Sequence, residues 1–435
     1  MQASPKTSPG NPSSAPENAS PGAARPSPKR LILLLLVGIV LVGIAWGVRS
    51  NRALREYILR SKDLSELEAM ARSQPDDSLT QYYLAKQYYL HRRFADAKTA
   101  YETAVRLDPG WARARLGLAL SYYELGQIGP AKAAFQQTLR LDNRQAWAEY
   151  MLGNIAWSEG DIREALSHVQ RAAELDPRSD QAWFGVAVCQ TQGHNYLQAI
   201  DALRKALARR EASAQYHTAL GELLVYRGDT EEARQHLERA LQLNPDYGQA
   251  CAAMGSFLLR KASGPEALDR AEELLLRATR RETLHPADVY FDLGQVYIQK
   301  GDFKKAVDAL QESLRKDARD ERAYYALANA YRRLGDAKSA AATEARFRRI
   351  SALHVEMQNL EARLSHNTQD ATTHLRLARV YRDLGLSQEA AQQYVAYLQL
   401  QPRDAKVIRE LEAYAEQHAQ AALSGKKDFV FEAPK

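Results

Sequence analysis

The chain has few of the residues from which disulfide frameworks and metal sites are built. Its only cysteines are Cys189 and Cys251, on apolar positions far apart in the sequence. This spacing excludes a disulfide framework and a cysteine-based metal site, so we expect two buried, small hydrophobic side chains. The ten histidines are scattered and include no His-Glu-x-x-His motif. The sequence therefore predicts no metal and no cofactor.

Motifs for nucleophilic catalysis and phosphate binding are also missing. No Gly-x-Ser-x-Gly elbow occurs. The segment Ser424–Lys427 lacks the upstream glycine of a phosphate-binding loop. Acid–base pairs such as Glu231 and Arg234 are typical of a solvated helix face. The sequence therefore predicts a protein that is not an enzyme.

An excess of positive charge is missing from most of the chain. The formal net charge is +6, but residues 1–63 hold nine Lys or Arg and three Asp or Glu, which leaves 50 of each for the remaining residues. Because the remainder is neutral, we expect no nucleic acid partner.

One long apolar run is present, from Leu31 to Val48, with eighteen residues and no charge. Such a run can cross a hydrocarbon layer about 30 Å thick, and Trp46 near its end suits the membrane interface. We predict an uncleaved single-pass anchor in the inner (cytoplasmic) membrane. The alternative is a cleaved export signal, which is disfavoured because no small-x-small site precedes the basic stretch Arg49–Arg60. Residues 1–30 contain seven prolines and predict a disordered tail.

Two arguments about the orientation of this anchor lead to opposite conclusions. More basic residues follow the run than precede it, which favours a cytoplasmic location for the rest of the chain. However, that arrangement requires a basic tail of thirty residues to cross the membrane. We therefore expect the rest of the chain on the extracytoplasmic side and keep the cytoplasmic alternative open.

Between Ser78 and Asp404 one apolar pattern returns nine times, mostly at a spacing of 34 residues. Its first copy consists of Leu84, Ala85, Tyr88, Ala97, Tyr101, Ala104 and Pro109. Steps of three and four residues predict two helices per unit, and such hairpins must stack into a solenoid to bury their apolar stripes. Glycines expected to take a positive φ fall between the two stripes: Gly126, Gly160, Gly228, Gly301, Gly335 and Gly385. Four are followed by a predicted N-cap: Asp161, Asp229, Asp302 and Asp336.

This pattern resembles the tetratricopeptide repeat (TPR) family over about three quarters of the chain. The resemblance implies an all-α, right-handed superhelical solenoid of TPR helical hairpins, here preceded by a single transmembrane helix. A narrower resemblance is to the anchored array of the lipopolysaccharide assembly protein B family. That family ends in a metal-binding domain with paired Cys-x-x-Cys ligands, which this chain lacks, so only the architecture carries over.

The expected domain order follows from these features. It is a Pro/Ser-rich tail (1–30), an anchor (31–48), a helical linker with a capping half-repeat (49–77), nine units (78–111, 112–145, 146–179, 180–213, 214–247, 248–286, 287–320, 321–354 and 371–404), a helical insertion (355–370), a capping helix (405–423) and a flexible tail (424–435).

Apolar residues continue at steps of three and four through the insertion: Ile350, Leu353, Met357, Leu360 and Leu364. One interpretation is a lengthened second helix that packs on its own array. The other is a short seam for self-association through residues 350–364.

The first helix of each unit offers a face that lines the concave channel in TPR arrays. The candidate peptide-binding residues on it are Tyr82, Lys86, Tyr89, Tyr123, Tyr150, Asn154, Trp157, Phe184, Tyr325, Asn329, Arg332, Arg376, Arg379 and Arg382. The face is aromatic towards the anchor and cationic towards the C-terminus, which suits an extended peptide with an acidic end. The alternatives are ordinary packing for the aromatic residues and a solvated face for the arginines. The carboxylate clamp of TPR co-chaperones is absent, because Tyr150 and Tyr325 occupy its lysine position.

Together these features predict a membrane-anchored TPR scaffold that binds other proteins or extended peptide segments, in the assembly or regulation of a bacterial-type envelope complex. The alternative is an exported soluble TPR protein that binds a polysaccharide or another polymer through its aromatic groove.

Overall fold

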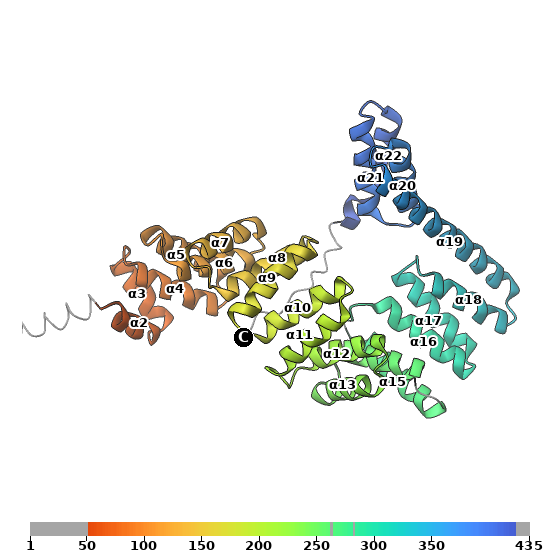
Figure 1. Cartoon of the computed structure of the whole chain (residues 1–435), viewed down its shortest axis with the longest axis horizontal. Coiled ribbons are helices and arrows are strands. Elements are labelled where there is room, and N and C mark those ends of the chain that lie inside the picture. Colours follow the sequence, from red (N-terminus) through yellow and green to blue (C-terminus); the bar gives the residue numbers. More distant parts are fainter. Residues whose placement is uncertain (1–50, 262–263, 282, 423–435) are drawn as a thin grey trace, which may run out of the picture. The chain divides into compact units, whose positions relative to one another are not determined.

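The computed structural model describes residues 51–422 apart from 262, 263 and 282. Every regular element in these ranges is an α-helix (Figure 1). None of these helices is both long enough and apolar enough to cross a membrane. The predicted tail at 1–30, the anchor at 31–48 and the tail at 424–435 lie outside the described residues.

The helices follow one another through short connections. They are α2 (Arg52–Arg60), α3 (Leu64–Ser73), α4 (Ser78–Leu90), α5 (Phe94–Leu107), α6 (Ala112–Glu124), α7 (Ile128–Leu141), α8 (Ala146–Ser158), α9 (Ile162–Leu175), α10 (Asp180–Gln192), α11 (Tyr196–Leu207), α12 (Ala214–Arg227), α13 (Thr230–Leu243), α14 (Gly248–Lys261), α15 (Pro265–Thr279), α16 (Pro286–Lys300), α17 (Phe303–Lys316), α18 (Glu321–Arg333), α19 (Ala337–His366), α20 (Ala371–Asp383), α21 (Ser387–Leu400) and α22 (Ala405–Ala422).

The chain divides into two compact units between Gly126 and Gln127. The described helices of the first unit are α2 to α6, and those of the second are α7 to α22. Within each unit, helices that follow one another pack as hairpins, such as α4 with α5, α8 with α9 and α16 with α17. All-helical hairpins in succession are the arrangement that the repeat predicts.

The helix contacts depend on small residues at the positions that the repeat reserves for them. The key positions of four units are at most 7% exposed: Leu84, Ala97, Leu118, Ala131, Leu152, Ala165, Leu220 and Ala233. This confirms the predicted register of the repeat. Glycines extend the pattern, because a Cβ atom on Gly221 would come within 2.7 Å of the Leu237 side chain. Cys189 and Cys251 are buried, as predicted.

The turns inside the hairpins use left-handed backbone conformations. All six predicted glycines have a positive φ, from 71° at Gly126 to 97° at Gly228. In two hairpins the same conformation falls on Arg92 (φ 59°) and His194 (φ 58°), where a side chain makes it less favourable. The predicted N-caps also form, and three of the four accept a hydrogen bond through the side chain. The exception is Asp229, whose carboxylate pairs with Arg227.

Helix α19 runs without interruption for 30 residues. Its apolar residues at 350–364 pack against a buried cluster formed mainly by α20, α21 and α22, which includes Leu377, Tyr394 and Val407. The first interpretation of this segment, packing on its own array, is therefore confirmed. The seam proposed for self-association is used within the chain.

Candidate functional site

The predicted groove residues of the first unit lie on α4 and α6 and are partly used in packing. Tyr82 is half-buried, and its ring lies 4.5 Å from that of Trp111, between centroids. The hydroxyl of Tyr89 donates a hydrogen bond to Glu124 at 3.1 Å. Tyr123 is half-buried, and Lys86 is exposed. Tyr82 therefore contributes to the core of this unit.

In the second unit the aromatic candidates differ in exposure. Tyr150 and Asn154 on α8 are 3% and 7% exposed, and Phe184 on α10 is 5% exposed. The Phe184 ring stacks on Tyr216 with 4.8 Å between centroids. Trp157 at the end of α8 is half-buried. Packing therefore accounts for much of the surface of Tyr150 and Phe184.

The structure brings Trp157 and Phe184 together as walls of one cavity of about 440 Å³. Helices α10 and α12 supply most of the other lining residues. Its mouth carries Tyr226 and Leu284, which are 69% and 53% exposed, and Tyr226 contacts Tyr196 with 4.3 Å between centroids. Large apolar side chains are therefore exposed to solvent at this cavity.

Tyr226 and Tyr196 were absent from the sequence-based candidates. The candidate positions on each first helix are two before, two after and five after the leucine-type residue, whereas Tyr226 lies six after Leu220 on α12. Tyr196 opens the second helix of its unit, which these positions do not include. The signal available in the sequence was an aromatic residue at the end of the predicted helix, two positions before Gly228.

A carboxyl group lies on the floor of the same cavity. Glu222 on α12 accepts a hydrogen bond from the side-chain amide of Gln249 at 2.7 Å. Burial raises the pKa of Glu222 to about 7, against the smaller opposing effect of this hydrogen bond. Among residues 51–422, apart from the three gaps, Glu222 is hydrogen-bonded by Gln249, and no cation offsets the effect of burial on its pKa.

A second cavity of about 260 Å³ continues from the first and shares Glu222, Gln249 and His285 with it. We call the two together the central trough. Asp292 on α16 lines the second cavity and accepts a hydrogen bond from the Ser256 hydroxyl. Burial raises the pKa of Asp292 as well.

Two arginines also line the second cavity, and they differ in how they are engaged. Arg322 donates to Asp288 at 2.6 Å and to Asp320 at 2.9 Å, and its guanidinium lies over the Phe291 ring. Arg260 donates from Nε to the Ser256 carbonyl oxygen at 3.2 Å. Arg322 is therefore already neutralised by carboxylates of the chain.

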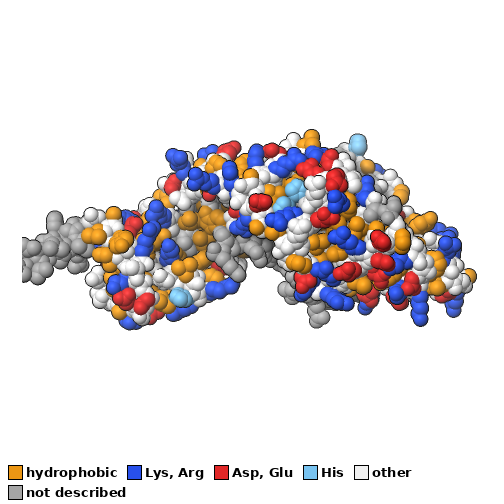
Figure 2. Space-filling model, turned by 90° about the horizontal axis from the view of Figure 1, so that it is seen from below, with side chains coloured by type: hydrophobic (Ala, Val, Ile, Leu, Met, Phe, Trp, Pro, Cys, Tyr) orange, Lys and Arg blue, Asp and Glu red, His pale blue; other side chains and the backbone are white. Residues whose placement is uncertain are grey.

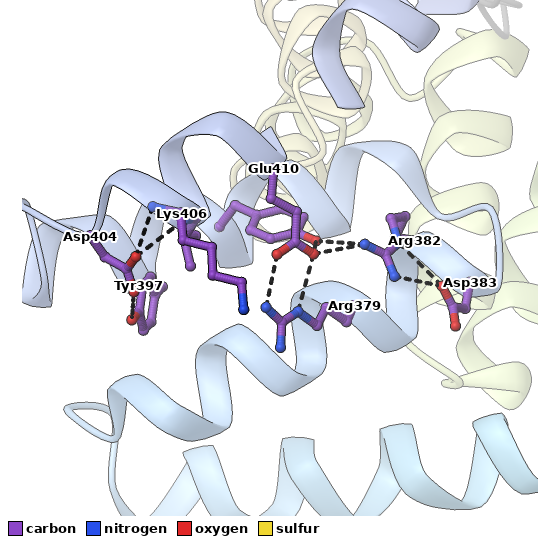
Figure 3. Close-up of polar contacts among 9 residues, drawn as sticks. Arg379, Arg382, Asp383, Tyr397, Asp404, Lys406 and Glu410 are labelled. Atoms are coloured by element: carbon purple, nitrogen blue, oxygen red, sulfur yellow. Dashed lines mark hydrogen bonds and ion pairs between the residues drawn. The ribbon is translucent and has the colours of Figure 1, made fainter. Parts of the chain in front are cut away.

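The arginines predicted to bind an acidic ligand end are engaged by carboxylates of this chain. Arg379 on α20 donates two hydrogen bonds to Glu410 on α22, at 3.1 and 2.8 Å, and Arg382 donates one at 2.7 Å (Figure 3). The Tyr394 hydroxyl donates a further bond to Glu410 at 2.8 Å. The arginines and this hydroxyl lower the pKa of Glu410 to about 2. Glu410 thus occupies the position expected for a ligand carboxylate.

The remaining C-terminal candidates do not join this cluster. Arg332 pairs with Glu344 at 3.2 Å, and Arg376 pairs with Glu356 at 3.0 Å. Tyr325 is 63% exposed, and Asn329 is half-buried. Because Arg382 also pairs with Asp383 at 3.1 Å, the four arginines pair with four different carboxylates instead of forming one anion site.

Comparison with known families identifies the repeats. Models described as tetratricopeptide repeat match residues 88–152, 150–217 and 214–247, and a model described as TPR repeat matches 287–335. The chain is a TPR repeat protein, and no enzyme family is indicated.

Among curated proteins, the chain is similar to anaphase-promoting complex subunit 7 of Dictyostelium discoideum. The two are 23% identical over 167 residues, which is 31% of this chain and 28% of that protein. The chain thus spans about a quarter of the length of this relative.

Several solved structures are similar to the chain. YrrB, described as a TPR protein with an unusual peptide-binding site, is 22% identical, with 43% of this chain and 97% of YrrB covered and a TM-score of 0.38. PilF of Pseudomonas aeruginosa is 18% identical, with 47% and 90% covered and a TM-score of 0.42.

Proposed function

We propose that this chain is a scaffold whose TPR array binds an extended segment of another protein in the central trough. The observation that carries the proposal is the exposed aromatic rim, above all Tyr226, around a cavity of about 440 Å³. Ligand sites have volumes of roughly 300–1,000 Å³, and aromatic side chains supply much of the binding free energy at protein interfaces. The neutral array fits this role, since Figure 2 shows cationic and anionic side chains interspersed over the visible face.

Site-specific photo-crosslinking tests this proposal in the full chain. A benzophenone amino acid at position 226 should yield an adduct that maps to one segment of one protein. The same group at position 57 is the matched control, because Tyr57 is also a highly exposed tyrosine, at 75%, on α2. No adduct at position 226, or the same adducts at both positions, would contradict a binding role for the trough.

The proposal extends to the membrane. The uncharged run Leu31–Val48 is long enough for a single span, and we propose that it anchors the array in the inner membrane of a bacterial-type envelope, with the array on the extracytoplasmic side. The chain would then serve in the assembly or regulation of an envelope complex. A reporter fused after Lys435 and active in only one compartment tests the orientation. Activity on the cytoplasmic side would overturn it.

The alternative proposal is an exported soluble protein that binds a polysaccharide through the aromatic rim. The half-buried carboxyl of Glu222 favours a protein segment instead, because a neutral polymer offers no charge to pair with it. Release of the full chain from membranes by alkaline carbonate would support the alternative. Retention would support the anchor.

A further inference from the structure

We propose that the segment bound in the central trough carries a lysine or arginine side chain beside an apolar side chain, and that the cation pairs with Glu222. This inference rests on the proposed function and specifies its ligand. It differs from the acidic ligand that the C-terminal arginines suggested.

The charges that line the trough leave one carboxyl without a cation. The lining includes three carboxyls, Glu222, Asp288 and Asp292, and two arginines, Arg260 and Arg322. Asp288 is paired with Arg322. Arg260 and Arg322 act electrostatically on Asp292, whereas no cation among the described residues shifts the pKa of Glu222.

A carboxylate withdrawn from water is costly unless a cation pairs with it. Among the described residues, Glu222 accepts a side-chain hydrogen bond from Gln249. Its raised pKa agrees with this, because the group holds a proton near neutral pH. A basic side chain would stabilise the ionised form, whereas an acidic ligand would be repelled by it.

The residues around Glu222 indicate that the ligand also carries an apolar side chain. The cavity that Glu222 shares with Trp157, Leu223 and Tyr226 is lined largely by apolar and aromatic side chains. An apolar ligand side chain would bury surface there, and aromatic faces also attract a nearby cation. The ligand class is therefore an extended basic and apolar segment.

Selection of random dodecapeptides displayed on phage against the purified full chain tests the inference. Enriched peptides should place Lys or Arg next to a large aliphatic or aromatic residue. A synthetic copy of the most enriched peptide should bind the Glu222→Gln variant about tenfold or more weakly, as expected for a lost charge-assisted hydrogen bond. Glutamine keeps the size of the side chain and the acceptor for Gln249.

The control is Glu273→Gln, which removes an exposed glutamate on α15, outside the trough. It should leave the affinity unchanged, and the circular dichroism of both variants should match that of the parent. Enriched peptides without basic residues, or equal binding to Glu222→Gln, would overturn the inference and leave the proposed function standing. Failure to enrich any peptide would overturn both.

The pH dependence of binding separates a cation from a neutral ligand group. Affinity for the enriched peptide should rise from pH 6 to pH 8, because the cation favours the ionised carboxylate. His285, Asp288, Asp292, Arg260 and Arg322 also face the trough, so the same titration is repeated with Glu222→Gln, in which the rise should vanish. A rise that persists in this variant would assign the effect to another group and contradict the pairing with Glu222.

Discussion

Ala165 shows how strictly the repeat limits side-chain size. It is fully buried on α9, and a Cβ atom added to Gly153 of α8 would lie only 3.3 Å from its carbonyl oxygen. We expect Ala165→Arg to destabilise the fold by about 2–4 kcal/mol through overpacking and a buried charge. Thermal unfolding followed by circular dichroism measures this. Ala341→Arg, at an exposed position of α19, should change the melting temperature little, and equal effects would contradict the register.

Arg92 holds a backbone conformation that other hairpins give to glycine. Its φ is 59°, and left-handed conformations are less favourable for residues with a Cβ atom. We expect Arg92→Gly to stabilise the protein by about 0.5–1 kcal/mol.

The adjacent Arg93→Gly is the control for this prediction. Arg93 has a φ of −86° and pairs with Asp96 at 2.7 Å, so glycine there should destabilise. The two melting temperatures should shift in opposite directions. A lower melting temperature for Arg92→Gly would show that its side chain matters more than its backbone.

His217 and His236 form a hydrogen-bonded pair in which the accepting ring, His217, must be neutral. His217 Nε2 donates to the Glu211 carbonyl oxygen at 2.9 Å, so its Nδ1 accepts from His236 Nδ1 at 2.8 Å. Burial lowers the pKa of both rings. Because the unfolded chain binds protons more readily, the stability that depends on neutral rings is complete above about pH 6.5 and is lost as the pH falls below it.

The melting temperature should therefore fall between pH 7 and pH 5. The charged groups near the pair are Glu211, Glu232, Arg204 and Arg239. His236→Gln removes one titrating ring, so its melting temperature should depend less on pH. An unchanged dependence in this variant would assign the effect to other groups.

At the scale of elements, α22 packs through apolar residues such as Val407 and through one carboxylate, Glu410, between two arginines. Glu410 stays ionised at neutral pH, because its pKa is about 2. We expect Glu410→Gln to destabilise the attachment of α22 by about 1–2 kcal/mol, since the pair is partly solvated. Hydrogen exchange of the α22 amides should then accelerate. Glu412→Gln on the exposed side of the same helix should leave the exchange unchanged.

The elements that the sequence predicted are those defined by local periodicity and turn chemistry. The positions of Leu152, Ala165 and Gly160 followed from the repeat alone. The pairing of Arg379 with Glu410 did not, because it depends on how α22 packs after the last repeat. Neither did the left-handed turn at Arg92, where no glycine marks it. Of the candidate peptide-binding residues, Trp157 and Phe184 line the central trough. Its exposed rim was missed, since it lies at helix ends that the repeat pattern does not constrain.

At the scale of the whole molecule, the apolar run and the described helices occupy different parts of the sequence, because the run ends at Val48 and α2 begins at Arg52. Since the anchor that we propose ends at Val48, we expect a chain that begins at residue 49 to be recovered without detergent and to remain helical. Circular dichroism and sedimentation measure these two properties. Recovery only in the membrane fraction would show that another part of the chain attaches it.

The uninterrupted course of α19 affects how the C-terminal end can come apart. Repeat arrays are described as rows of neighbouring units, and the boundary between folded and unfolded units ordinarily falls in a loop. Here one helix of 30 residues belongs to the hairpin with α18 and also packs against α20 to α22. A boundary at this place must break helical hydrogen bonds, and a helix once broken must nucleate again. Local unfolding that starts at α22 should therefore stop at α19. A protease that degrades the chain from this end would then not reach the helices before α19.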